Sequence, residues 1–398
     1  MPRRDTLTIP TPAIKQQHKA MKYPSSIVFV IHGLPMGGAE KFMISIVNHL
    51  FAIDFNPIVI LLSNDDTLAN EISNGIPIIK VLKNSRYDLS VSHRTRKVIV
   101  AHGAQKIFCV NPYAYFLTKL AFLFDEQYQI FLSPHTTKPF SLYNWFQTFV
   151  YFRLVGKRDT LVYLCHRQQD YLTKKYWLPA CEQRVIYNGI NTETFNPALY
   201  EGMSREDIRA SYSLDKNDKL ILLVARINPE KRHSDALNAL SVIHKMQGVV
   251  KPHLMIVGAG NTALYAKLKL LVSDLQLEAY VHFAGNQSDV RIFYYIADIF
   301  TLTSESETFS IAALEAMAFG LPCALTDVGG AREMIVEDWN GTLANPLHPK
   351  SIATAWLNAL KNNNNGHSIR AYVEQRFSLP KMLNQYVNLL SQPMVQPT

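Results

Sequence analysis

Short apolar runs recur along the whole chain and alternate with longer runs of helical period. Runs this short and β-branched are typical of strands buried in a parallel sheet, and their alternation with helices predicts helices on both sheet faces. In the first half the expected strands are Ile27–Ile31, Pro57–Leu62, Ile107–Val110, Gln129–Leu132, Thr160–Leu164 and Arg184–Tyr187. In the second half they are Lys219–Val224, His253–Val257, Tyr280–Phe283, Ile299–Thr303 and Pro322–Thr326.

A polar, turn-rich segment, Asn188–Pro197, separates the two sets of strands and is suited to a linker. We therefore predict an α/β protein of two Rossmann-like parallel-sheet domains, residues 25–190 and 191–378, preceded by a flexible tail over residues 1–24. Ligands of open α/β sheets bind beyond the carboxyl ends of the strands. Both domains should therefore present their binding edges to a cleft between them.

The segment Thr303–Pro322 (TSESETFSIAALEAMAFGLP) joins a strand to a helix and carries two glutamates, Glu307 and Glu315, eight positions apart. Ser310 is suited to the N-cap of this helix and Gly320 to its end. Free N–H groups at the helix start can bind an anion, and the two carboxylates can accept hydrogen bonds from sugar hydroxyls. The segment therefore predicts a nucleotide-sugar site, although a glutamate in a first helical turn can also serve only to complement the helix dipole.

Two cations, Arg226 and Lys231, lie five positions apart on the loop after another second-half strand. Together they can grip both phosphates of a nucleoside diphosphate and stabilise its negative charge as it departs. Exposed basic residues are more often simply solvated, so this prediction depends on its surroundings. His135 follows a first-half strand, where a lone histidine is more often structural than catalytic.

Two glycine turns lie between a strand and a helix. Gly37 and Gly38 would let the backbone approach a ligand closely, although a tight turn without any ligand has the same sequence. Gly258 and Gly260 fit the GxGxx(G/A) pattern of dinucleotide-binding proteins. An NAD-dependent enzyme would also need an acidic residue at the end of the next strand. The strand Tyr280–Phe283 runs into Ala-Gly-Asn instead, which argues against that alternative.

These motifs resemble, in the same order, those of the retaining family-4 glycosyltransferases of the GT-B fold. The resemblance covers about residues 27–390 and rests on the Glu-x7-Glu segment, on GGAEK, on VARINPEKRH and on NGINTETF. The last two are similar to the family patterns GRxxxEKG and NGIDTxxF, with Arg232 where Gly is frequent and Asn191 where Asp is usual. The closing run resembles the family's helix, here about residues 379–395, that crosses back to the first domain.

The resemblance implies a role for each candidate residue. It implies that Glu307 and His135 contact the transferring sugar and that Arg226 and Lys231 contact the diphosphate, and these four are the expected catalytic residues. Glu315 is expected to hold the ribose. The further donor contacts that the resemblance implies are Gly37, Gly38, Gly258, Asn286, Thr308, Phe309, Ser310 and Ile311.

The activity implied by the resemblance is transfer of a hexose with retention of anomeric configuration, in which the leaving phosphate helps to deprotonate the acceptor. The co-substrate is a nucleoside-diphosphate sugar, with UDP-sugars favoured by their frequency in the family, and no cofactor is expected. The acidic pair Asp65-Asp66 lies far from the predicted site, so we expect no metal requirement. The expected acceptor is a glycan or lipid-linked intermediate of cell-surface polysaccharide or lipopolysaccharide synthesis. A sugar-nucleotide epimerase and a non-transferring nucleotide-sugar binder of the same fold stay as alternatives.

Length and composition suit such an enzyme. The 398 residues are 48% hydrophobic and 18% charged, which fits two well-packed α/β domains and argues against disorder. The four cysteines are scattered without a CxxC pair, so we expect reduced thiols in a cytoplasmic protein and no disulfide frame or zinc site. The N-terminal segment lacks an apolar core of signal-peptide length, and no uncharged apolar run is long enough to span a membrane.

Positive charge is concentrated in the first half of the chain. Residues 1–200 carry 22 Lys and Arg against 13 Asp and Glu, whereas residues 201–398 carry 18 against 19. No nucleic-acid-binding motif accompanies this basic half, so we expect an anionic membrane surface and no nucleic acid as partner. The aromatic run from Leu142 to Phe152, followed by Arg153, Lys157 and Arg158, could enter a membrane interface, although an ordinary core helix is the simpler interpretation.

Overall fold

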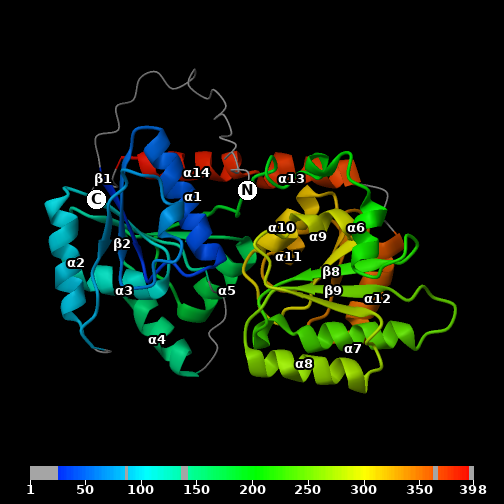
Figure 1. The fold of residues 1–398 in the computed structure, drawn as a ribbon. Helices are drawn as coiled ribbons and strands as arrows, with labels where there is room; N and C mark the ends of the chain where they lie inside the picture. The colour runs from blue at the N-terminus through cyan, green and yellow to red at the C-terminus, as the bar shows by residue number, and fades with distance from the viewer. Residues whose placement is uncertain (1–25, 86–87, 136–141, 362–365, 394–398) are drawn as a thin grey trace.

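The computed structural model describes residues 26–85, 88–135, 142–361 and 366–393 of the chain. These residues form two lobes that lie side by side, each built on one parallel sheet with helices on both faces (Figure 1). The predicted fold class is confirmed. A parallel sheet has to be covered on both faces because its strands are apolar on both sides, which is why strands and helices alternate along each lobe.

The first lobe holds a seven-stranded sheet of order β3-β2-β1-β4-β5-β6-β7. Its strands are β1 (Ser26–Ile31), β2 (Asn56–Leu61), β3 (Ile78–Lys80), β4 (Lys106–Cys109), β5 (Gln129–Leu132), β6 (Thr160–Tyr163) and β7 (Glu182–Val185). Its helices are α1 (Gly38–Ala52), the 3-10 turn η1 (Ala69–Glu71), α2 (Ser90–Ala101), α3 (Pro112–Ala121), α4 (Leu142–Arg153) and α5 (His166–Tyr176).

The second lobe holds a six-stranded sheet of order β10-β9-β8-β11-β12-β13. Its strands are β8 (Leu220–Val224), β9 (His253–Val257), β10 (Val281–Gly285), β11 (Ile299–Leu302), β12 (Cys323–Thr326) and β13 (Gly341–Ala344). Its helices are η2 (Pro197–Tyr200), α6 (Arg205–Ser211), η3 (Pro229–Lys231), α7 (His233–His244), α8 (Thr262–Asp274), α9 (Arg291–Ile296), α10 (Ile311–Ala318), α11 (Ala331–Met334), α12 (Pro349–Lys361) and α13 (Gly366–Phe377).

The last helix, α14 (Leu379–Ser391), leaves the second lobe and packs on α1 of the first lobe (Figure 1). The buried ammonium group of Lys106, on β4, donates hydrogen bonds to the carbonyl oxygens of Leu390 and Gln392, at 2.6 and 2.5 Å. These carbonyls end a helix and have no partner within it, so the lysine satisfies them and fixes the end of α14 to the first sheet.

One apolar core links the lobes. Fully buried side chains of one face of the first sheet, such as Phe29, form a continuous cluster with Tyr386 of α14, Phe309 beside α10, and Phe300 of the second sheet. Two further cores each cover the other face of one sheet. The two lobes therefore share buried surface, which holds their binding edges in a defined relation.

Two strands were missed by the sequence analysis, the edge strands β3 and β13. Each has only three or four residues and contains no long apolar run, so its existence depends on pairing with a neighbouring strand. The strand expected at Arg184–Tyr187 lies slightly earlier, as β7. Among the described residues, no helix is both long enough and apolar enough to cross a bilayer.

Candidate active site

The predicted site residues lie on loops at the carboxyl ends of strands in both sheets. Arg226 and Lys231 follow β8, Glu307 follows β11, and His135 follows β5. Gly38 begins α1 after β1. Because parallel strands end at one edge of a sheet, each lobe brings its candidates to a single edge. The two edges meet at the lobe boundary, where Thr308 bonds to His135 and Gly38 lies opposite Ile311.

Lys231 and Glu307 form an ion pair between their Nζ and Oε1 atoms. The same Oε1 accepts a 2.8 Å hydrogen bond from the hydroxyl of Ser304. The backbone of the two loops is joined as well, because the amide of Glu305 donates to the carbonyl of Glu230 at 2.8 Å. Both charged side chains are only about one-fifth exposed. The predicted diphosphate-binding lysine and the predicted sugar-binding glutamate are therefore direct neighbours.

The helix after Glu307 begins as its sequence predicts. The hydroxyl of Ser310 accepts a 3.2 Å hydrogen bond from the amide of Ala313, which makes Ser310 the N-cap of α10. The helix ends before Gly320, whose φ of +80° is a conformation that favours glycine. At the other end, Gly38 of the first lobe lies opposite Ile311, since a Cβ at Gly38 would stand 3.4 Å from Ile311 Cδ1. The start of α10 thus faces the glycine pair of the first lobe.

Glu315 is half-buried on α10, and its Oε2 accepts a 2.7 Å hydrogen bond from the hydroxyl of Tyr294 on α9. Burial raises the pKa of Glu315 to about 7, whereas the hydrogen bond from Tyr294 and the positive charge of Lys41 act in the opposite direction. Lys41 belongs to the first lobe, so the two lobes are electrostatically coupled at this carboxylate. Glu315 can therefore change its charge near neutral pH.

His135 ends the described part of its loop, and its ring packs on Phe42 with centroids 4.5 Å apart. Burial lowers the pKa of His135 to about 3, so the imidazole is neutral at physiological pH. Its carbonyl oxygen accepts a 3.0 Å hydrogen bond from the hydroxyl of Thr308 in the second lobe. His135 is thus joined to the loop of Glu307 and is suited to hydrogen bonding rather than to carrying a positive charge.

Gly258 is required by packing of the second lobe's own backbone. Its φ is +137°, and a Cβ there would lie 2.1 Å from the carbonyl oxygen of Ala225. The turn around Gly258 therefore supports the loop of Arg226, whose side chain is exposed. Asn286 is also exposed, directly after Gly285, whose carbonyl accepts a 2.7 Å hydrogen bond from the amide of Gly258.

Glu40 of the first lobe lies within electrostatic reach of Arg226 of the second lobe. Burial raises the pKa of Glu40, on α1, and the positive charge of Arg226 acts to lower it. Sequence reasoning assigned no role to Glu40, Lys41 or Tyr294, although the first two lie only two and three positions after Gly38. Only contact between segments far apart in the sequence identifies them.

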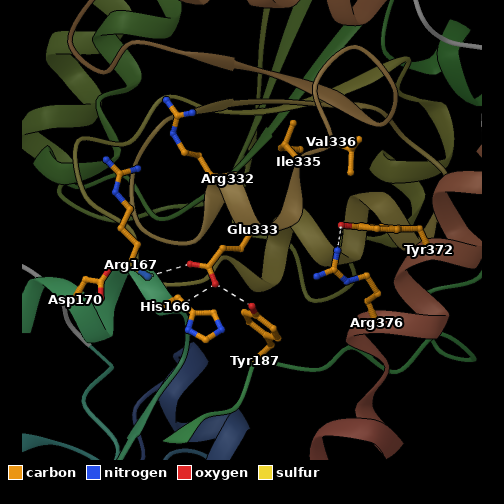
Figure 2. Close-up of a pocket in the computed structure, with 10 residues that line it drawn as sticks. All are labelled: His166, Arg167, Asp170, Tyr187, Arg332, Glu333, Ile335, Val336, Tyr372 and Arg376. Carbon is orange, nitrogen blue, oxygen red and sulfur yellow. Dashed lines mark hydrogen bonds between the residues drawn. The ribbon is translucent and has the colours of Figure 1, made fainter. Parts of the chain in front are cut away.

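Residues of both lobes also line a pocket of about 420 Å³ beside this site (Figure 2). The carboxylate of Glu333, on α11, lies between His166, Arg167 and Tyr187 of the opposite side. A further inter-lobe ion pair joins Arg167 to Asp327 at 2.6 Å. None of these residues was assigned a catalytic or donor-binding role from the sequence.

Comparison with known proteins places this geometry in a family. Residues 36–194 match the family described as Glycosyltransferase Family 4, and residues 204–376 match Glycosyl transferases group 1. Together the two matches span most of both lobes. The chain belongs to the family-4 glycosyltransferases of the GT-B fold, as its motifs indicated.

The individual relatives are distant. The chain is 28% identical to N-acetyl-alpha-D-glucosaminyl L-malate synthase of Bacillus anthracis, over 52% of this chain and 53% of that protein, so it spans about half the length of this relative. It is 24% identical to UDP-Gal:alpha-D-GlcNAc-diphosphoundecaprenol alpha-1,3-galactosyltransferase of Escherichia coli, over 70% of this chain and 67% of that protein. Its fold is similar to that of Anabaena HepE in complex with UDP-glucose, with a TM-score of 0.75 and 21% identity, covering 92% and 99% of the two chains.

Proposed function

We propose that this chain is a retaining glycosyltransferase that moves a hexose from a nucleoside-diphosphate sugar, with a UDP-sugar favoured, to a hydroxyl of a glycan or lipid-linked acceptor. The observation that carries the proposal is the ion pair between Lys231 and Glu307, on the loop that leads into the capped start of α10 and contacts the first lobe through Thr308. A cation for the diphosphate and a carboxylate for the sugar are therefore held side by side at the edge where GT-B ligands are expected.

In this mechanism Arg226 and Lys231 hold the diphosphate and stabilise its charge as the bond from the sugar C1 to the phosphate oxygen breaks. The acceptor oxygen bonds to C1 from the same face, and its proton passes to the leaving phosphate oxygen. Glu307 accepts hydrogen bonds from the sugar hydroxyls, and Glu315 accepts one from the ribose. The neutral imidazole of His135 is suited to a hydrogen bond with the transferring sugar. No enzymic nucleophile and no metal ion take part.

The acceptor side of the proposal concerns cell-surface polysaccharide or lipopolysaccharide synthesis at the cytoplasmic face of a membrane. The Escherichia coli relative is named for a diphosphoundecaprenol acceptor, which supports a lipid-linked acceptor here. The basic balance of residues 1–200 supports reversible attachment to anionic lipid. On α4 the ring of Phe146 is 59% exposed whereas that of Phe152 is buried, so the helix has both a core face and an apolar exposed one.

Donor screening tests the proposal. The purified protein is first mixed with UDP-, GDP- and ADP-sugars, and a rise in the temperature of unfolding identifies the donor. The stabilising donor is then incubated with lipid-linked and oligosaccharide acceptors, and the anomeric configuration of the product is read by NMR. A product of retained configuration, formed equally with EDTA, is expected. A product of inverted configuration would contradict the proposed retention of configuration. Complete loss of transfer on chelation would contradict the proposed independence of metal ions.

Two other outcomes would indicate a different function. Binding of the donor with hydrolysis or no reaction, whatever acceptor is supplied, would indicate a non-transferring nucleotide-sugar protein. Conversion of the donor to its sugar epimer without any acceptor would indicate an epimerase. Both alternatives would keep the second lobe, but neither needs a pocket for an acceptor.

A further inference from the structure

The carboxylate of Glu333 accepts three hydrogen bonds, and all three donors belong to the first lobe. Its Oε2 accepts from the backbone amide of His166 at 3.0 Å and from the hydroxyl of Tyr187 at 2.9 Å, and its Oε1 accepts from the amide of Arg167 at 3.0 Å (Figure 2). His166 and Arg167 are the first two residues of α5, and Tyr187 lies just after β7. A single carboxylate of the second lobe therefore caps a helix of the first.

The cap that α5 carries in its own lobe is weak. Cys165 stands at the N-cap, and its Sγ accepts from the amide of Gln168 at 3.4 Å. Sulfur is a poor hydrogen-bond acceptor, and the first amides of a helix have no partner within the helix. The carboxylate of Glu333 accepts hydrogen bonds from the first two amides of α5, which the thiol does not bind. Its negative charge also complements the positive end of the α5 dipole.

The helical turn that carries Glu333 is attached to the loop of the proposed catalytic glutamate. The amide of Gly330 donates a 2.7 Å hydrogen bond to the carbonyl of Thr308. Gly329, at φ +52°, lies so close that a Cβ there would be 2.3 Å from the carbonyl oxygen of Glu307. A shift of this turn must therefore shift Glu307 as well, because close-packed backbone leaves no room for independent movement.

We propose that Glu333 is a positioning residue: by capping α5 from the opposite lobe, it fixes the Glu307–Thr308 segment against the first lobe. Besides the core that links the lobes, each lobe has a core of its own, so we expect each lobe to fold without this single contact. The expected consequence for catalysis rests on the proposed function. The consequence for lobe arrangement does not.

The test is Glu333→Gln, which keeps the size of the side chain but replaces one accepting oxygen by an NH₂ group facing an N–H donor. Small displacements of catalytic groups cost up to about 10²-fold in rate, so kcat for transfer should fall by roughly 10- to 100-fold. The dissociation constant for the free nucleotide should change by less than about threefold, because residues proposed to bind it are untouched. The radius of gyration by small-angle X-ray scattering should increase as the lobes separate.

Glu337→Gln is the matched control, because Glu337 is exposed and accepts a 3.1 Å hydrogen bond from the amide of Leu343 within its own lobe. It should leave both kcat and the radius of gyration unchanged. Tyr187→Phe removes only one of the three hydrogen bonds and should give a smaller change of the same kind, which keeps the test decisive if Glu333→Gln does not fold.

Unchanged kcat and unchanged radius of gyration in Glu333→Gln, or equal changes in Glu337→Gln, would overturn the proposal. Loss of kcat without lobe separation and with weaker nucleotide binding would also overturn it, since Glu333 would then act on the donor site directly. If the wild-type protein transfers no sugar, the proposed function fails, whereas the scattering comparison still decides the role of Glu333.

Discussion

The hydroxyl of Tyr294, on α9, donates a 2.7 Å hydrogen bond to Oε2 of Glu315, on α10. Tyr294 is fully buried, so the bond holds the carboxylate in one orientation. Burial has raised the pKa of Glu315 to about 7, and the hydrogen bond opposes that rise. Nucleotide binding should therefore depend on pH near neutrality.

The first prediction is that donor affinity rises with pH across roughly pH 6 to 8, because the charged carboxylate is the better acceptor for ribose hydroxyls. Tyr294→Phe should move this transition to higher pH, since it removes a bond that stabilises the charged form. Isothermal titration with the nucleotide at several pH values measures both. The stability of the fold should respond to pH with the opposite sign. Between the ordinary pKa of a glutamate, 4.5, and the raised pKa of Glu315, about 7, the native state holds more protons than the unfolded chain. The contribution of Glu315 to the free energy of unfolding therefore falls as pH rises from 4.5 to about 7. A pH-independent affinity in both proteins would contradict the role of Glu315.

Glu307 and Glu315 should differ in what their removal costs. Glu315→Ala should weaken nucleotide binding by about 1.5–3 kcal/mol, the value of a charge-assisted hydrogen bond. Glu307→Ala should lower turnover by orders of magnitude while nucleotide binding stays the same or tightens slightly, because Lys231 is then released from its ion pair. Binding constants and single-turnover rates separate the two effects, and equal losses of nucleotide affinity in both variants would rule out this division of roles.

Gly258→Ala should destabilise the second lobe by roughly 3 kcal/mol or more, because a Cβ would meet the carbonyl oxygen of Ala225 and the backbone is in a region that glycine favours. Gly248→Ala is the control: its φ is +70° but no atom lies within 4 Å of the added Cβ, so it should cost only about 1 kcal/mol. Urea unfolding measures the difference. Similar values for the two variants would show that close packing at Gly258 contributes little.

Lys106→Met should loosen α14 from the first lobe. The substitution removes two charge-assisted hydrogen bonds to the end of the helix. Burial of a neutral side chain in place of a charged one offsets part of this loss, so we expect the free energy of unfolding to fall by about 2 kcal/mol. Lys381→Met, at an exposed position of the same helix, should change it by less than about 0.5 kcal/mol. Limited proteolysis near the C-terminus should report the loosening, and equal resistance of both variants would refute it.

Vesicle sedimentation tests the membrane part of the proposal. Each basic residue near an anionic bilayer contributes about 1 kcal/mol, and the attraction decays over about one Debye length. Binding should therefore rise with the anionic lipid content and disappear at high salt without detergent. Phe146→Ser should weaken it further, with Leu270→Ser, at a comparably exposed site of the second lobe, as the control. Indifference to lipid charge would remove the membrane from the proposed function.

Most of the architecture could be predicted from local patterns. The strand leading to Glu307, the N-cap at Ser310 and the helix end at Gly320 each depend on residues within a few positions of one another, and all three occur where the sequence places them. Apolar runs and capping residues act through short-range geometry, so one chain is enough to identify them. The short edge strands could not be found in this way, because their stability comes from a partner strand.

Contacts between the candidate residues were decided only by the tertiary structure. Lys231 and Glu307 are 76 positions apart, and no local pattern shows that they form an ion pair. The cap that Glu333 provides for α5 spans an even longer separation and joins two lobes. The sequence by itself determined which elements form and which side chains stand at their ends. Packing of the two sheets determined which of those side chains meet, because burial and charge depend on every element that surrounds a group.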